Sequence, residues 1–125
     1  MLNVLLVGAG GFVGSVGRYL LSGWVQNSVR QAWLPYGTLA VNVVGCLLIG
    51  WISGLAENRE VFRPETRVLL LIGVLGGFTT FSTFGYETFH LARDGEWVKA
   101  AGNVTAQVVL GFLAVWAGHA LSRFM

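Results

Sequence analysis

Four long stretches of the chain carry no Asp, Glu, Lys or Arg, and the charged residues are bunched between them. The stretches are Met1–Gly17, Gln31–Ala56, Val68–Tyr86 and Ala100–Ser122. A helix that crosses the hydrocarbon core of a bilayer needs about 20 mostly apolar residues. The pattern therefore predicts an all-α membrane protein with four transmembrane helices, at about residues 2–25, 36–56, 67–89 and 98–122.

Residues near the ends of these stretches agree with the prediction. Pro35 is well placed to start the second helix. Trp24, Trp33, Tyr36 and Trp97 fall near helix ends, where aromatic side chains collect at the membrane interface. The alternative for the first stretch is a cleaved signal peptide, which would need basic residues before its apolar core.

Composition restricts the remaining possibilities. Of 125 residues, 54% are hydrophobic and 11% are charged. Four spans use about 80 residues and leave about 45 for loops and tails, so we expect residues 1–125 to form a single integral membrane domain and not an enzyme. A net charge of 8 − 6 = +2, scattered along the chain, does not favour nucleic-acid binding. The one cysteine, Cys46, excludes an internal disulfide.

Glycines recur at helical spacing. Residues 4–14 (VLLVGAGGFVG) look like a dinucleotide-binding turn, but that turn needs an acidic residue about 20 positions on. The next acid after Gly14 is Glu57, beyond the second stretch. The pattern instead favours close helix packing through small residues four apart, in the pairs Gly10/Gly14, Gly50/Gly54 and Gly73/Gly77.

The basic residues do not set one orientation. Loops rich in Lys and Arg stay in the cytoplasm. One membrane face would carry four, namely Arg59, Arg63, Arg67 and Arg123, and the other face would also carry four, namely Arg18, Arg30, Arg93 and Lys99. Two interpretations follow: a weak bias overridden by one strong span, or insertion in both orientations, with antiparallel copies paired about a two-fold axis in the membrane plane.

Polar residues at membrane depth are costly and often functional. Thr38 and Asn42 share one face of the second span, and Asn103 and Gln107 share one face of the fourth. One interpretation is hydrogen bonding between helices. The other is that the two faces line an aqueous path between copies, since four helices are too few to enclose a wide cavity.

The third span contains an unusual string, GGFTTFSTFG, over residues 76–85. Two glycines followed by hydroxyl residues argue against an unbroken helix. Irregular backbone at membrane depth survives only where it is buried in protein or lines a watery site, and broken helices in transporters offer free carbonyls to cations. The string is therefore the best candidate for an ion site.

Two phenylalanines in this string share a helix face, because Phe81 and Phe84 are three residues apart. Ring edges carry partial positive charge, so the pair either packs in the ordinary way or meets a small anion. Arg18 and Glu87 are charges inside the span limits, near one membrane face, where both can reach toward the interface. The two histidines, His90 at a loop edge and His119 deep in the fourth span, do not by themselves make a metal site.

Three segments resemble the CrcB/Fluc fluoride ion channels: GGFVGSVGRYLL at Gly10–Leu21, GTLAVN at Gly37–Asn42 and GGFTTFSTF at Gly76–Phe84. The resemblance covers the whole chain. It implies a dual-topology antiparallel homodimer with two pores in the bacterial inner membrane, as a multi-pass protein. It also implies passive export of fluoride from the cytoplasm, which keeps the toxic ion at a low concentration.

The resemblance implies roles for individual residues. A structural sodium ion would be held by backbone carbonyls of Gly76 and Thr79. The fluoride pathway would take its phenylalanine pair from Phe81 and Phe84 and its amide from Asn42, beside Thr38. Its hydroxyls would come from Ser82 and Thr83, with Arg18 and Glu87 in support. Gln107 departs from the small hydroxyl residue that is frequent at its position, and it can still donate through its amide nitrogen.

Two other functions remain open. A small dual-topology proton-coupled multidrug exporter would need a carboxylate near the middle of a span. A membrane assembly subunit without transport would explain the glycines but not a broken, aromatic-flanked third helix.

Overall fold

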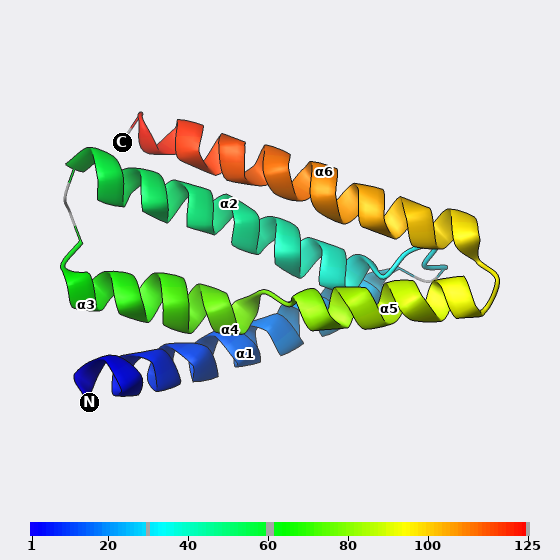
Figure 1. The fold of residues 1–125 in the computed structure, drawn as a ribbon, viewed down its shortest axis with the longest axis horizontal. Coiled ribbons are helices and arrows are strands. Elements are labelled where there is room, and N and C mark those ends of the chain that lie inside the picture. The colour runs from blue at the N-terminus through cyan, green and yellow to red at the C-terminus, as the bar shows by residue number, and fades with distance from the viewer. Residues whose placement is uncertain (30, 60–61, 125) are drawn as a thin grey trace.

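The fold is known from a computed structural model that describes residues 1–29, 31–59 and 62–124, without the side chains of Asn58 and Arg59. Every regular element in the described residues is a helix (Figure 1). They are α1 (Leu2–Ser28), α2 (Tyr36–Arg59), α3 (Pro64–Arg67), η1 (Val68–Leu75), α4 (Gly76–Phe78), α5 (Phe81–Arg93) and α6 (Trp97–Ser122). The predicted all-α class is confirmed.

Four helical stretches are long and apolar enough to cross a membrane, as predicted. They are Leu2–Ser28, Tyr36–Glu57, Pro64–Arg93 and Trp97–Ser122. The third is longer than expected at both ends. It begins with Pro64, whose missing N–H costs nothing in a first helical turn. It ends before Gly95, which turns the chain into α6 with a φ of 80°.

The helices pack in two close pairs, α2 with α6 and α1 with the first half of the third span (Figure 1). Glycines make both contacts possible. A Cβ at Gly73 would lie 3.0 Å from the Cα of Gly10, and one at Gly77 would lie 2.6 Å from the carbonyl oxygen of Gly11. On α2, a Cβ at Gly50 would clash with the backbone of Val115. The spaced glycines therefore serve packing within one chain.

The third span is interrupted at Thr79 and Thr80, halfway along its apolar stretch. Both residues are extended, with φ/ψ of −79°/157° and −149°/113°. The break follows the glycine pair instead of falling on it, because Gly76 and Gly77 stay helical and Gly77 packs against α1. The wider π-type winding of η1, a feature often found at functional sites, precedes the break.

Arg18 reaches the break of the third span. It lies well inside α1, and its Nη1 is 3.4 Å from the carbonyl oxygen of Thr79 at the break. The helix is longer than predicted and continues to Ser28, so Arg18 lies in its interior. Arg18 is therefore not a loop charge, and the basic tally becomes four against three. In that tally, Arg30 and the side chain of Arg59 lie outside the described part of the chain.

Candidate functional site

Asn42 holds the broken backbone of the third span. Its Oδ1 accepts a hydrogen bond from the N–H of Thr80 at 2.9 Å, and its Nδ2 donates to the carbonyl oxygen of Thr80 at 3.0 Å. The same Nδ2 donates to Oε1 of Gln107 at 3.1 Å. One side chain of α2 therefore satisfies the backbone of the break and connects it to α6, which makes irregular backbone tolerable at membrane depth.

Beside the hydrogen bonds of Asn42 lies a cavity of about 330 Å³ between α2, α6 and the start of α5, which we call the phenylalanine cavity. All of its lining side chains are neutral. It is lined by Asn42, Gly45, Cys46, Ile49, Thr79, Thr80, Phe81, Phe84, Gln107 and Val108.

The two phenylalanines of this cavity form an edge-to-face pair. Their ring centroids are 5.4 Å apart and their planes are inclined by 64°. Phe84 is half-buried, whereas Phe81 is 82% exposed in the single chain. Edge-to-face geometry offers a positive ring edge beside a neutral amide, so the lining can attract a desolvated anion without a full positive charge.

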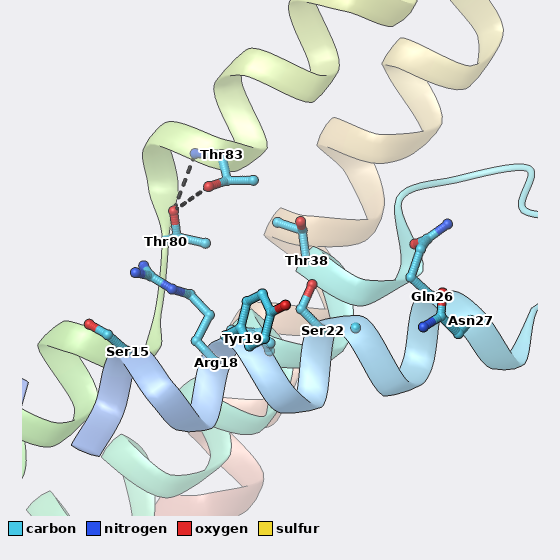
Figure 2. A pocket seen from close by; sticks show the side chains of 11 residues that line it. Ser15, Arg18, Tyr19, Ser22, Gln26, Asn27, Thr38, Thr80 and Thr83 are labelled. Atoms are coloured by element: carbon cyan, nitrogen blue, oxygen red, sulfur yellow. Dashed lines mark hydrogen bonds between the residues drawn. The ribbon is translucent and has the colours of Figure 1, made fainter. Parts of the chain in front are cut away.

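A second cavity, of about 480 Å³, opens on the other side of the break, and we call it the α1 cavity (Figure 2). Its polar lining comes from α1, α2 and the beginning of α5: Ser15, Arg18, Tyr19, Ser22, Gln26, Asn27, Thr38, Thr80 and Thr83. Thr80 lines both cavities, so the extended residue held by Asn42 stands between them.

Thr80 also starts α5. Its Oγ1 accepts a hydrogen bond from the N–H of Thr83 at 3.2 Å and donates to Oγ1 of Thr83 at 2.9 Å (Figure 2). Sequence reasoning missed Thr80 as a site residue. The signal was available, since a threonine immediately before a helical segment is a favoured cap. The hydroxyl of Ser82 is 3.4 Å from that of Thr80.

Glu87 is anchored to α2. The Oγ1 of Thr38 donates to its Oε1 at 2.7 Å, and its other carboxyl oxygen is buried without a partner among the described residues. On α6, the fully buried Asn103 donates to Oγ1 of Thr88 at 2.9 Å. The polar faces expected on the second and fourth spans therefore both meet α5, and both make hydrogen bonds between helices.

Three of the predicted site residues lie outside the linings of both cavities, namely Gly76, Ser82 and Glu87. Gly76 is exposed, and a Cβ there would meet nothing nearer than the Leu71 carbonyl oxygen, at 3.9 Å. Packing within the chain therefore gives no reason for a glycine at this position.

The carbonyl oxygens at Gly76 and Thr79 have the hard character that alkali and alkaline-earth cations prefer. Such ions take about six oxygen ligands, more than these two residues of one chain provide. The guanidinium of Arg18 also competes for the Thr79 oxygen. The residues thus fit a cation only where a second copy adds its own carbonyls.

The family described as CrcB-like protein, Camphor Resistance (CrcB), matches residues 5–119. This chain belongs to the CrcB-like family. Its family relatives include a protein of Geobacter sulfurreducens named "Fluoride-specific ion channel FluC", which is 49% identical over 98% of each chain.

Further CrcB-like relatives carry similar names. A Geotalea daltonii protein named "Fluoride-specific ion channel FluC" is 46% identical over the full length of both chains. A Methanosarcina acetivorans protein named "Fluoride-specific ion channel FluC 1" is 48% identical over 94% of this chain and 88% of its own. With its four apolar spans, this CrcB-like chain is a multi-pass membrane protein whose relatives are named as channels and not as enzymes.

Proposed function

We propose that this CrcB-like chain forms a fluoride-selective ion channel, which lets fluoride leave the cytoplasm passively through the inner membrane and so lowers its toxic concentration. The observation that carries the proposal is the phenylalanine cavity, an uncharged lining beside a break halfway along an apolar span. Full-length relatives named as fluoride-specific channels support it.

A neutral lining suits conduction of a small anion. Attraction between full charges at low dielectric is many times that in water, so a lysine or arginine at the narrowest point would trap the ion. Conduction needs several weak sites. The ring edges of Phe81 and Phe84, the amides of Asn42 and Gln107, and the hydroxyls of Thr38, Ser82 and Thr83 offer such sites along the proposed pathway, with Arg18 and Glu87 in support.

The proposed assembly is an antiparallel homodimer of dual topology. The single chain exposes a polar side chain beside the break, Ser82, and leaves open space beside Gly76. A second copy packed over the break would cover them. The basic tally of four against three leaves little preference for one orientation.

We further propose a structural sodium ion between the two breaks, held by carbonyls of Gly76 and Thr79 from both copies. When bound, the ion would supply positive charge that holds together backbone segments which otherwise repel each other through their carbonyl dipoles. The exposed Gly76 supports this placement, since it allows the close approach of a partner.

The test is a transport assay on purified protein in liposomes. A fluoride electrode should record rapid fluoride release once valinomycin balances the charge, with chloride retained. A proton-coupled multidrug exporter would instead exchange protons for an organic cation and release no fluoride. An assembly subunit would release neither. The Gln31→Met variant changes an exposed turn residue and should match the unchanged protein.

A further inference from the structure

The peptide group that joins Thr79 to Thr80 is held from two helices. Its N–H donates to Oδ1 of Asn42 on α2, at 2.9 Å. A trans peptide group is planar, so its N–H and C=O point in opposite directions, and the described residues contain no cis peptide bond. The Thr79 carbonyl oxygen therefore turns away from Asn42 and toward α1, where Nη1 of Arg18 lies 3.4 Å from it.

The side chain of Thr79 is fixed on both of its branches. Its Oγ1 donates to the carbonyl oxygen of Leu75 at 2.9 Å, and its backbone N–H donates to the same oxygen at 3.0 Å. Its methyl carbon, Cγ2, occupies the space that a Cβ would take at Gly45 on α2. Because the two branches of a threonine turn together, any other rotamer would move the hydroxyl off the Leu75 oxygen.

Gly45 differs from the glycines that bring helix backbones together. A Cβ at Gly50 or Gly77 would clash with the backbone of a neighbouring helix, whereas at Gly45 the clash is with one methyl group. Without that methyl, the nearest atoms to such a Cβ would be Cδ1 of Phe78 at 3.5 Å and Cβ of Thr79 at 3.7 Å, which are ordinary contact distances. Gly45 therefore makes room for one side-chain group at the break.

We infer that Gly45 is a positioning residue for the Thr79 carbonyl oxygen, a ligand of the proposed sodium ion. The inference rests on the sodium site proposed above and names a residue outside that site on which it depends. Gly45 lies three residues after Asn42, so both contact the break from one side of α2. Asn42 holds the peptide group through Thr80, and Gly45 holds it through the side chain of Thr79.

An added methyl group at position 45 would disturb this oxygen. In Gly45→Ala the new Cβ clashes with Cγ2 of Thr79, so Thr79 must give up its hydroxyl bond to Leu75 or move together with its carbonyl. Sodium binding must then reverse that change. The sodium concentration for half-maximal stabilisation should rise by about fivefold or more, which corresponds to one lost hydrogen bond.

Thermal unfolding of the purified full-length protein, titrated with sodium chloride against N-methyl-D-glucamine chloride, measures this midpoint. Gly45→Ala should shift the midpoint and Gly54→Ala should not. Gly54 is the matched control, because it lies on the same helix and a Cβ there also clashes with a side chain, that of Ser122. A general loss of stability would lower both melting temperatures without moving the sodium midpoint. An unshifted midpoint in Gly45→Ala would overturn the inference.

A second variant covers the case in which Gly45→Ala fails to assemble. Thr79→Ser removes only the methyl group and keeps the hydroxyl for Leu75. In that background Gly45→Ala should be harmless, because its Cβ takes the vacated space and its nearest neighbour is Phe78 at 3.5 Å. The double variant should therefore match Thr79→Ser in yield and sodium midpoint. A double variant as impaired as Gly45→Ala would contradict the inference, because Gly45 would then not serve the Thr79 methyl.

The sodium site and the role of Gly45 fail in different ways. If the unchanged protein shows no sodium response, the sodium site is wrong and the inference falls with it. If the protein responds and Gly45→Ala responds at the same sodium concentration, the site stands and the role of Gly45 is wrong. Fluoride release from liposomes made with the same preparations tests the channel function independently of both.

Discussion

The side chain of Asn42 makes the two hydrogen bonds that Thr80 would make to its own backbone in a continuous helix. It accepts from the Thr80 N–H at 2.9 Å and donates to the Thr80 carbonyl oxygen at 3.0 Å. Backbone groups at membrane depth have no water to bind, so a break in a spanning helix needs such a partner. The break and the asparagine on α2 therefore depend on each other.

This relationship predicts a loss of stability when the amide is removed. Asn42→Leu leaves both polar groups of Thr80 unpaired and should cost about 2 kcal/mol or more of unfolding free energy. Ser28→Ala removes one exposed hydrogen bond, to the carbonyl oxygen of Trp24 in its own helix, and should cost about 1 kcal/mol or less. Thermal unfolding in detergent measures both. Equal melting temperatures for the two variants would mean that the hydrogen bonds between Asn42 and Thr80 stabilise the protein no more than an ordinary surface hydrogen bond.

The helical spans and the existence of the break were predictable, since both follow from local sequence. A run of about 20 residues without charges forms a helix that crosses the bilayer. Glycines and hydroxyl residues weaken a helix wherever they cluster. The location of the break was less predictable, because Gly77 is held helical by its contact with Gly11, which is far away in the sequence.

The candidate site was predictable in its residue types but not in its connections. Spacing could place Asn42 and Gln107 on helix faces, yet only the tertiary packing of α2 on α6 shows that they bind each other. The contact of Arg18 with the carbonyl oxygen of Thr79 could not be predicted for a similar reason. The end of α1 depends on where the loop to α2 begins, and Gln26 helps to fix that point by accepting from the N–H of Gly37.

Aromatic substitution tests the pathway. Phe81→Ile and Phe84→Ile keep apolar bulk but remove the ring edge, so each should lower fluoride release by about tenfold if the contact supplies about 1.4 kcal/mol at the barrier. Phe89→Ile, on the same helix but outside the phenylalanine cavity, should conduct normally. Release must be compared at equal dimer yield. Near-normal fluoride release in both cavity variants would mean that the two rings serve packing and do not stabilise the ion.

Dual topology predicts mixed accessibility in cells. Single cysteines at Gln31 and Glu65, in a Cys46→Ala background, lie at opposite ends of the bundle and leave the Lys/Arg tally unchanged. A membrane-impermeant maleimide should label a fraction of the molecules at each position, because copies insert both ways. One position labelled completely and the other never would establish a single orientation.

The proposed sodium site predicts an ion-dependent assembly. Replacing sodium by N-methyl-D-glucamine should lower the thermal stability of the dimer, and Gly76→Val should abolish this sodium dependence because the added bulk separates the two breaks. Gly8→Val is the matched control, since a Cβ at Gly8 meets nothing within 4 Å and one at Gly76 meets only the Leu71 carbonyl oxygen, at 3.9 Å. A Gly76→Val dimer that still responds to sodium would exclude the site.

Passive fluoride selectivity is the central claim, and the zero-current potential in a planar bilayer tests it most directly. With unequal sodium fluoride on the two sides, equal chloride and equal pH, the current should vanish at the equilibrium potential of fluoride. It should stay there when a pH gradient is added. A potential that follows the chloride or proton gradient, or a bilayer without fluoride current, would contradict the account.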